Sequence, residues 1–209
     1  MITLAIDTSH VVAVGIDIDG EHTSLIVGDE RAHVEQLTPT INALCSGLDI
    51  SLRDVDRYVV GMGPGPFTGL RVGIATGATL AHVADKPLHR VCSLDALALS
   101  VEGAGDFVAA SDARRKELYW ALYVGGRRAG DPRVTAPTEL PDLPVYGPVP
   151  EAYRETLRFA GERNIDPGLL ANRFAELDVS LDEPYYLRGA DAVVPGAPKS
   201  ALPRLQVRR

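Results

Sequence analysis

GMGPGPFTGLRVG, residues 61–73, is the stretch that decides the fold. Five of its first six residues are glycine or proline, which excludes both helix and central strand and predicts a tight turn. A helix should begin directly after this turn, with Thr68 as its N-cap. The residues that we expect to shape the turn are Gly61, Gly63, Pro64, Gly65 and Thr68.

The helix predicted after the turn has one face with almost no side chains. Gly69, Gly73 and Gly77 are spaced four residues apart and Ala81 continues the row, so the four share one face. Each interior glycine costs a helix about 1 kcal/mol relative to alanine, so the row makes sense only where another backbone approaches closely. That backbone belongs either to the chain's own sheet or to a second chain, and periodicity favours neither. A second row beside it can pack: Leu70, Ile74 and Ala78.

Other interpretations of the glycine-rich stretch are weaker. The G-x-x-x-G spacing suggests a transmembrane helix, but Arg71, His82 and the helix-breaking turn argue against one. No G-x-x-x-x-G-K-[ST] is present, and Pro66 stands where the dinucleotide fingerprint needs its third glycine. Anion binding by the bare amides at the helix start remains an alternative.

Composition predicts a cytoplasmic protein with no membrane contact. The 209 residues are 45% hydrophobic and 23% charged, as in globular proteins. The net charge of −7 disfavours direct binding of nucleic acid, so another protein should bind most of any RNA. Cys45 and Cys92 form no C-x-x-C pair, which fits a reducing compartment. The first residues lack the features of a signal peptide, and no apolar run is long enough to span a bilayer.

The first half of the chain alternates strands and helices. Apolar runs at 2–6, 11–18 and 22–27 predict a three-stranded antiparallel meander, with Asp19-Gly20 as one turn. Strands are also expected at 57–61 and 88–92. A helix is expected at 31–47, interrupted at Pro39. Its apolar stripe consists of Val34, Leu37, Ile41 and Leu44.

The opening pattern returns in the second half. An apolar strand at 107–111 ends at Asp112, as the first strand ends at Asp7, and tight turns follow at matching distances. This weak internal repeat predicts a duplicated, two-lobed architecture. We expect lobes at 1–103 and 104–188 and a flexible tail at 189–209. Within the second lobe, Asp166-Pro167 predicts the start of another helix.

These features together resemble the TsaB (YeaZ) family of bacteria, well over residues 1–125 and thinly beyond. The resemblance implies an α/β fold with the two lobes of actin, the seventy-kilodalton chaperones and the sugar kinases, each lobe a mixed sheet with helices and the second lobe reduced. The stretches that carry it are Ile6-Asp7-Thr8-Ser9, residues 61–73, Asp112-Ala113-Arg114, Glu117-Leu118-Tyr119-Trp120 and Pro184-Tyr185-Tyr186-Leu187-Arg188.

The resemblance also implies a function. Members of this family are non-catalytic subunits that bind the catalytic paralogue TsaD. With the ATPase TsaE, the pair transfers a threonylcarbamoyl group to the adenosine next to the anticodon of ANN-decoding tRNAs. ATP and metal are then expected on the partners and none on this chain alone, and tRNA is reached only indirectly. The implied contact combines the helix at 31–47 with the helix after the glycine turn: Val34, Leu37, Ile41, Leu44, Gly69, Leu70, Gly73, Ile74, Gly77 and Ala81.

The residues themselves carry little catalytic chemistry. No two of the five histidines are four residues apart, so the paired-histidine metal motif of TsaD is missing. The turns after Asp7 and Asp112 contain no glycine, and their side chains would crowd a phosphate. Asp7, Thr8 and Asp112 mark the position of a vestigial nucleotide cleft, where the two aspartates could hold Mg²⁺. A structural role for them is favoured, because a strand-ending aspartate accepts hydrogen bonds from the turn that follows.

Three functional hypotheses therefore compete. The first is the non-catalytic subunit, in which Gly73→Leu should break the heterodimer and leave the monomer folded. The second is an enzyme in its own right, either an actin-like ATPase, a small-molecule kinase or a peptidase, although no G-x-S-x-G or activated cysteine is visible. The third is a homodimeric scaffold that pairs through the bare helix face. The basic cluster at 114–116 is either solvated or a contact for a partner.

Overall fold

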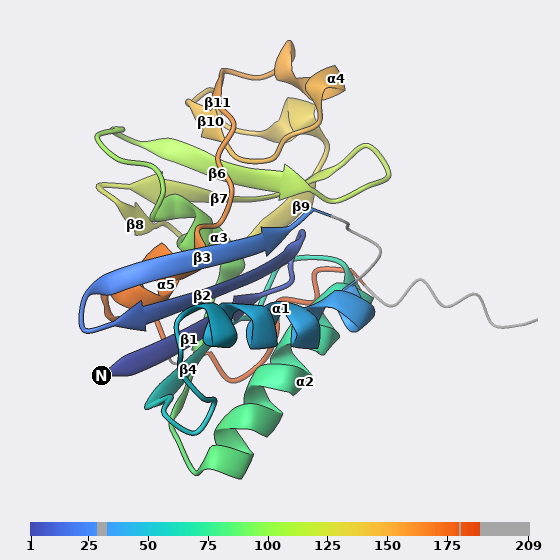
Figure 1. Cartoon of the computed structure of the whole chain (residues 1–209). Helices are drawn as coiled ribbons and strands as arrows, with labels where there is room; N and C mark the ends of the chain where they lie inside the picture. The colour runs from blue at the N-terminus through green and yellow to red at the C-terminus, as the bar shows by residue number, and fades with distance from the viewer. Residues whose placement is uncertain (29–32, 180, 189–209) are drawn as a thin grey trace, which may run out of the picture.

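The fold contains two β-sheets, one above the other in Figure 1. The computed structural model describes residues 1–28, 33–179 and 181–188. In the first sheet, β1 (Ile2–Asp7), β2 (Val12–Ile18) and β3 (Glu21–Val27) form an antiparallel meander, which confirms the prediction. β4 (Arg57–Gly61) and β5 (Leu88–Val91) then add in parallel beside β1, giving the order β3-β2-β1-β4-β5.

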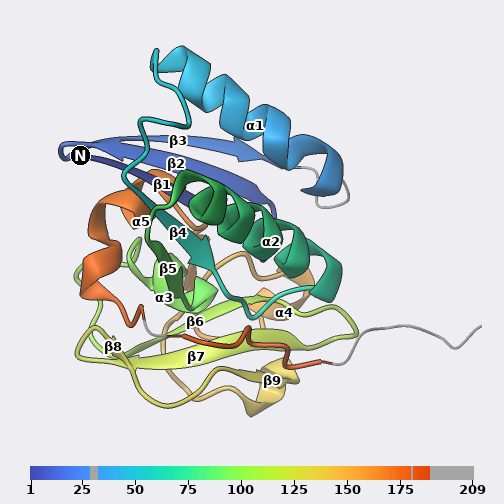
Figure 2. The ribbon, with the colours of Figure 1, turned by 90° about the horizontal axis from the view of Figure 1, so that it is seen from below.

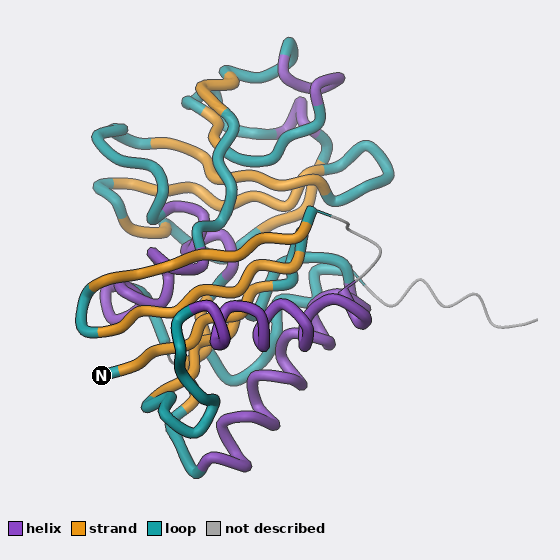
Figure 3. The backbone as a smooth tube through the Cα atoms, in the orientation of Figure 1, coloured by secondary structure: helices purple, strands orange, loops and turns teal. Residues whose placement is uncertain are grey.

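The second sheet repeats this topology. β6 (Phe107–Asp112) and β7 (Leu118–Val124) are antiparallel, and β10 (Val145–Tyr146) and β11 (Phe159–Gly161) add in parallel on the far side of β6. The short strands β8 (Arg127–Arg128) and β9 (Arg133–Thr135) both pair with β7, so the order is β11-β10-β6-β7-β8. The matching orders confirm the predicted repeat and the two-lobed fold. Figure 3 shows how much of this second half is loop.

Helices cover the first sheet on both faces because its strands alternate their buried side chains between the two sides. Leu4 and Ile6 of β1 pack with α1 (His33–Gly47) and α2 (Phe67–Ala84), which lie side by side in Figure 2. Ala5 packs with Leu170 of α5 (Pro167–Arg173) on the opposite face. The remaining helices are short: α3 (Ser93–Ala98), α4 (Glu151–Arg154), η1 (Pro137–Glu139) and η2 (Phe174–Glu176).

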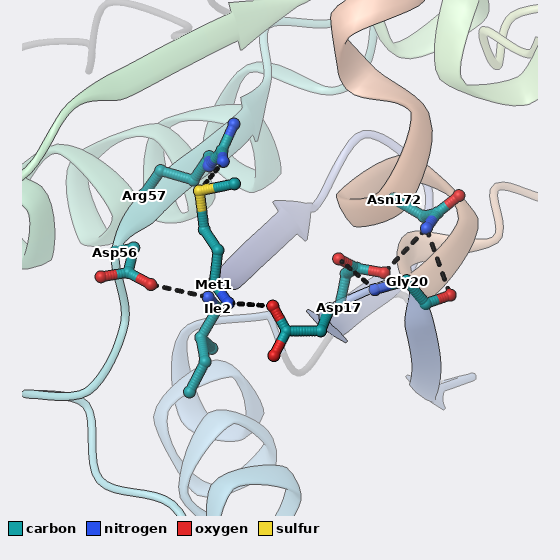
Figure 4. Close-up of polar contacts among 8 residues, drawn as sticks. Met1, Ile2, Asp17, Gly20, Asp56, Arg57 and Asn172 are labelled. Atoms are coloured by element: carbon teal, nitrogen blue, oxygen red, sulfur yellow. Dashed lines mark hydrogen bonds and ion pairs between the residues drawn. The ribbon is translucent and has the colours of Figure 1, made fainter.

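Helix α5 corrects the predicted domain boundary. It lies across β1, β2 and β3 of the first sheet although its sequence position falls within 104–188. The approach is very close, since a Cβ on Gly15 would lie 2.0 Å from the carbonyl carbon of Pro167. Asn172 also donates a hydrogen bond to the Asp17 carboxylate at 2.8 Å, at the end of the β2–β3 hairpin (Figure 4). The second half of the chain therefore supplies part of the first lobe. The predicted tail, 189–209, lies outside the described residues.

The helix α2 starts two residues earlier than predicted, and its N-cap is different. The cap is Pro66, the helix begins at Phe67, and no side chain caps its first amides. Thr68 is therefore not the N-cap. The prediction relied on the usual preference for threonine at an N-cap. Here the glycine- and proline-rich turn ends at Pro66, and the helix begins directly after it.

Candidate functional site

The turn after β1 lies at the centre of the candidate site and is buried. Asp7 is 2% exposed, and both of its carboxylate oxygens accept hydrogen bonds from this chain. Oδ1 accepts from the amide of Ser9 at 2.8 Å and from its hydroxyl at 2.6 Å, and Oδ2 accepts from the hydroxyl of Ser93 at 2.6 Å. Burial raises the pKa of Asp7, because its desolvation outweighs these hydrogen bonds. The carboxylate is therefore occupied by internal partners.

The glycine-rich stretch packs directly against this turn. A Cβ on Gly61 would lie 1.8 Å from Oδ2 of Asp7, and one on Gly65 would lie 2.6 Å from the carbonyl oxygen of Ser9. Thr8 lies against the first turns of α2, where its hydroxyl donates to the carbonyl oxygen of Gly69 at 2.8 Å. The Ile-Asp-Thr-Ser opening and residues 61–73 are thus one structural unit, and its glycines allow the two segments to touch.

A small cavity lies beside Asp7, between the two lobes. Its volume is about 20 Å³, and its lining includes Ser9, His10 and Ser111. That volume suits roughly one water molecule, whereas small-molecule sites measure about 300–1,000 Å³. Asp112 does not line it. Instead, Asp112 accepts a hydrogen bond from the amide of Arg114 at 2.9 Å and forms an ion pair with its side chain at 3.4 Å. The cavity therefore does not unite the two aspartates that the sequence suggested for Mg²⁺.

Residues 1–28, 33–179 and 181–188 offer few groups for metal binding or nucleophilic chemistry. Within these ranges no three His, Cys, Asp or Glu side chains are grouped to hold a metal ion. Cys45 and Cys92 are free and buried, and burial raises the pKa of Cys92 to about 12, so its thiol stays protonated at neutral pH. No helix in the same ranges combines the length and the apolar character needed to cross a membrane.

The glycine row of α2 faces the chain's own sheet, which corrects the predicted partner interface. A Cβ on Gly73 would lie 2.3 Å from Oγ1 of Thr8, and one on Gly77 would lie 2.2 Å from Cγ1 of Val60. Of the two interpretations, packing on the chain's own sheet is right and docking of a second chain on this row is wrong. The other predicted interface residues that are buried in the chain itself are Leu37, Ile41, Leu44, Gly69, Leu70 and Ala81.

The remaining two predicted interface residues differ. Ile74 is partly buried against the first core, and the side chain of Val34 lies outside the described residues. Periodicity correctly identified a bare helix face and an apolar stripe on α1. It could not tell which surface covers them, because a strand of the same chain and a helix of another chain both need small residues in order to pack closely.

The opposite face of α2 is exposed, and no sequence pattern indicated it as a candidate surface. It carries a second row at four-residue spacing, offset by two positions from the glycine row: Arg71, Ala75, Thr79 and Val83. Val83 is 79% exposed, which is unusual for an apolar side chain of this size. The neighbouring α1 exposes small uncharged residues as well, among them Thr38, Asn42, Ala43 and Ser46. This surface, the α1–α2 face, is mostly uncharged in an acidic protein.

A second, larger cavity of about 850 Å³ lies where α3 meets β7, β8 and the segment after α5. Its wall contains a buried hydrogen-bond network. Asp95 accepts from the hydroxyl of Tyr123 at 2.6 Å and from Nε of Arg128 at 2.9 Å, and the Arg128 guanidinium lies 5.6 Å over the Tyr185 ring. Burial raises the pKa of the Tyr123 hydroxyl well above its ordinary value. The network joins the first lobe to the second, and no sequence motif indicated it.

Comparisons with known proteins agree with this geometry. The model of a family described as TsaD, tRNA N6-adenosine threonylcarbamoyltransferase, matches residues 22–167. An uncharacterized protein of Mycobacterium tuberculosis is 39% identical over 199 residues, which cover 90% of this chain and 92% of that protein. The tRNA threonylcarbamoyladenosine biosynthesis protein TsaB of Haemophilus influenzae is 35% identical over 125 residues, covering 58% of this chain and 53% of TsaB. The chain thus aligns with only about half of that relative's length.

The structural comparison extends further along the chain. The structure of YeaZ from Pseudomonas aeruginosa superimposes with a TM-score of 0.71 at 28% sequence identity. The superposition covers 84% of this chain and 92% of YeaZ. It therefore includes both lobes, whereas the alignment with TsaB covers little more than half of the chain.

Proposed function

The chain belongs to the TsaD family, in which its named relatives include TsaB (YeaZ) proteins, and we propose that it is a non-catalytic subunit in tRNA threonylcarbamoyladenosine biosynthesis. In this proposal it binds a TsaD-like catalytic paralogue in the cytoplasm. The paralogue then transfers the threonylcarbamoyl group to the adenosine beside the anticodon. ATP and metal act on the partners, which include a TsaE-like ATPase.

One observation carries the non-catalytic part of the proposal. The cleft between the lobes is the position at which actin-like enzymes act on a nucleotide, and here its central carboxylate is hydrogen-bonded within the chain. Asp7 binds Ser9 and Ser93 and lies beside a cavity of only about 20 Å³. Three hydrogen bonds from Ser9 and Ser93 leave this carboxylate at most about one free acceptor position, and the cavity beside it is far too small for a nucleotide.

The partner contact is assigned to the α1–α2 face. Ala75 and Thr79 leave the middle of the exposed row on α2 nearly flat, so a helix of the paralogue can approach closely. Val83 and the partly buried Ile74 supply apolar area at this contact. The contact keeps the two helices that the family resemblance implied, but it uses the faces opposite to the glycine row and the apolar stripe.

Substitution at Ala75 tests the contact. The exposed Ala75→Glu variant should fold like the wild type, since its side chain points away from the sheet, and should bind the purified paralogue at least about tenfold more weakly, because an unpaired charge would be buried. Binding is measured by titration calorimetry and assembly by size-exclusion chromatography. The matched control is Ala152→Glu, the same change at an exposed position of α4.

The outcomes separate the competing functions. Intact pairing of Ala75→Glu would place the contact elsewhere on the chain, and a wild-type chain that never pairs with the paralogue would contradict the proposed function. Light scattering of the isolated chain tests the homodimeric scaffold, in which a second copy covers the α1–α2 face. Micromolar binding and turnover of ATP with Mg²⁺ by the isolated chain would favour an enzyme.

A further inference from the structure

The hairpin between β6 and β7 ends in three consecutive basic residues with an unusual backbone. Arg114, Arg115 and Lys116 have φ angles of 60°, 51° and 63°, and all three are exposed. The left-handed conformation is disfavoured for residues with a Cβ and normally occurs singly. Runs of such residues persist only where the surrounding structure determines them, which is typical of functional segments.

Several contacts hold this turn in place. The amide of Ala113 donates to the carbonyl oxygen of Glu117 at 3.0 Å, and the amide of Glu117 donates to the carbonyl oxygen of Arg114 at 3.0 Å. Arg188, from the far end of the described chain, donates to the carbonyl oxygen of Ala113 at 2.6 Å and forms an ion pair with Glu117. The turn is therefore fixed in shape before any partner arrives.

The same segment that supplies Arg188 joins the turn to the start of α2. The ring of Tyr186 lies 4.9 Å from that of Phe67, and the guanidinium of Arg71 lies 5.3 Å over the Phe67 ring. Figures 1 and 2 both show the tip of the hairpin at the end of the molecule where α2 begins. We call this surface the basic tip: Phe67, Arg71, Arg114, Arg115, Lys116, Tyr186 and Arg188.

The charge of the basic tip is opposite to that of the whole chain. It holds five basic side chains in a protein of net charge −7, and two of them form ion pairs, Arg114 with Asp112 and Arg188 with Glu117. A local positive surface on an acidic protein is suited to a polyanion that meets the chain at this point only.

We propose that the basic tip binds the phosphate backbone of the RNA on which the complex acts, an inference that rests on the proposed function. Guanidinium and ammonium groups neutralise phosphates, and Tyr186, which is 40% exposed, offers a ring on which an unpaired base can stack. Consecutive residues of a left-handed turn point in different directions. Their charges therefore suit a curved backbone better than the flat acidic surface of a protein. The tRNA contact is thus partly direct, although the partner holds most of the RNA.

The test uses the complete complex with its paralogue and a labelled tRNA transcript carrying an ANN anticodon. In the tip variant, Arg114→Asn, Arg115→Asn and Lys116→Asn are combined, because asparagine tolerates the left-handed conformation. The control removes the same charge by the same substitution at three exposed arginines elsewhere: Arg53, Arg127 and Arg163. A third variant keeps the charge through Arg114→Lys and Arg115→Lys.

The tip variant should bind tRNA about 10- to 100-fold more weakly, with a slope of log affinity against log salt that is smaller by about two to three. The control and lysine variants should stay close to the wild type. Equal affinity and slope in the tip variant would overturn the inference, as would a loss of pairing with the paralogue instead, which would make the tip a protein contact. Assembly is measured first, so a wild-type chain that forms no complex counts against the proposed function as well.

Discussion

Gly73 lies so close to Thr8 that the glycine row of α2 is needed for the single chain to fold. The substitution Gly73→Ala should lower the free energy of unfolding by about 1–3 kcal/mol through overpacking, since the added Cβ would lie 2.3 Å from the Thr8 hydroxyl oxygen. Gly73→Leu should prevent folding. This outcome is the opposite of the sequence-based expectation that the variant would stay folded and lose only its partner, because Thr8 of the same chain covers the Gly73 face.

Urea denaturation measures the effect, with Ala75→Leu as the control on the exposed face of the same helix. The control should stay within about 0.5 kcal/mol of the wild type. Wild-type stability in Gly73→Ala would mean that α2 can move away from the β1 turn at no cost.

Asp7 should make stability depend on pH. Its folded pKa is raised above the ordinary value of 3.8, so its protonated form favours the fold. That contribution is complete below the unfolded pKa and is lost as the pH rises through the folded pKa. Asp7→Asn, which imitates the protonated group, should therefore gain stability relative to the wild type as the pH rises from about 4 to 8. Parallel unfolding free energies over that range would contradict a raised pKa.

A strand-ending aspartate could be assigned a structural role from its sequence position alone, and Ser9 is a partner that such a turn predicts. Ser93 could not be found in this way, because it is 86 residues away and meets Asp7 only when β1, β4 and β5 pair. The burial that raises the pKa of Asp7 depends on the same tertiary packing.

The N-cap Asp166 fixes the start of helix α5. The Asp166 side chain accepts hydrogen bonds from the amides of Gly168 at 3.0 Å and Leu169 at 3.1 Å, as the Asp-Pro start predicted, and also from the Ser24 hydroxyl of β3. Asp166→Ala should cost about 0.5–2 kcal/mol of unfolding free energy, measured in urea. Glu155→Ala, at an exposed acid beside α4, is the control. An unchanged midpoint for Asp166→Ala would show that packing alone holds the helix.

The helices show where sequence patterns stop being informative. The 3.6-residue periodicity located α1 and α2, and the cap located α5. What covers each face depends on which segments meet in space. The same pattern of Gly69, Gly73 and Gly77 fits a sheet or a partner helix, and the apolar side of α5 fits either lobe.

Across the whole molecule, Asp95 connects the lobes through Tyr123 and Arg128. Asp95→Ala removes the carboxylate that pairs with Arg128, whose side chain is only 13% exposed, and should cost about 3–5 kcal/mol. Hydrogen exchange should then increase in β7 and β8 more than in β1. Glu176→Ala, which breaks the more exposed pair with Arg173, should cost less than about 1 kcal/mol. Equal effects of the two variants would argue that the Asp95 network does not join the lobes.

The two-lobed plan was predictable because duplication leaves a repeat that survives as matched spacing, with Asp7 and Asp112 at equivalent strand ends. The contacts between the lobes do not repeat. Asp95, Tyr123 and Arg128 lie on three different elements, and no periodicity relates them. The same holds for the left-handed turn at 114–116, whose three basic residues carry no glycine signal.

The return of α5 to the first sheet constrains how the nascent chain matures. All five strands of that sheet have been synthesised by residue 91, yet the side of it that carries Ala5 and Val59 lacks its α5 cover until residues 167–173 emerge from the ribosome. While residues 92–173 are being synthesised, an apolar surface is therefore open to aggregation or to a chaperone. A premature stop codon before residue 167 would leave that surface permanently without α5.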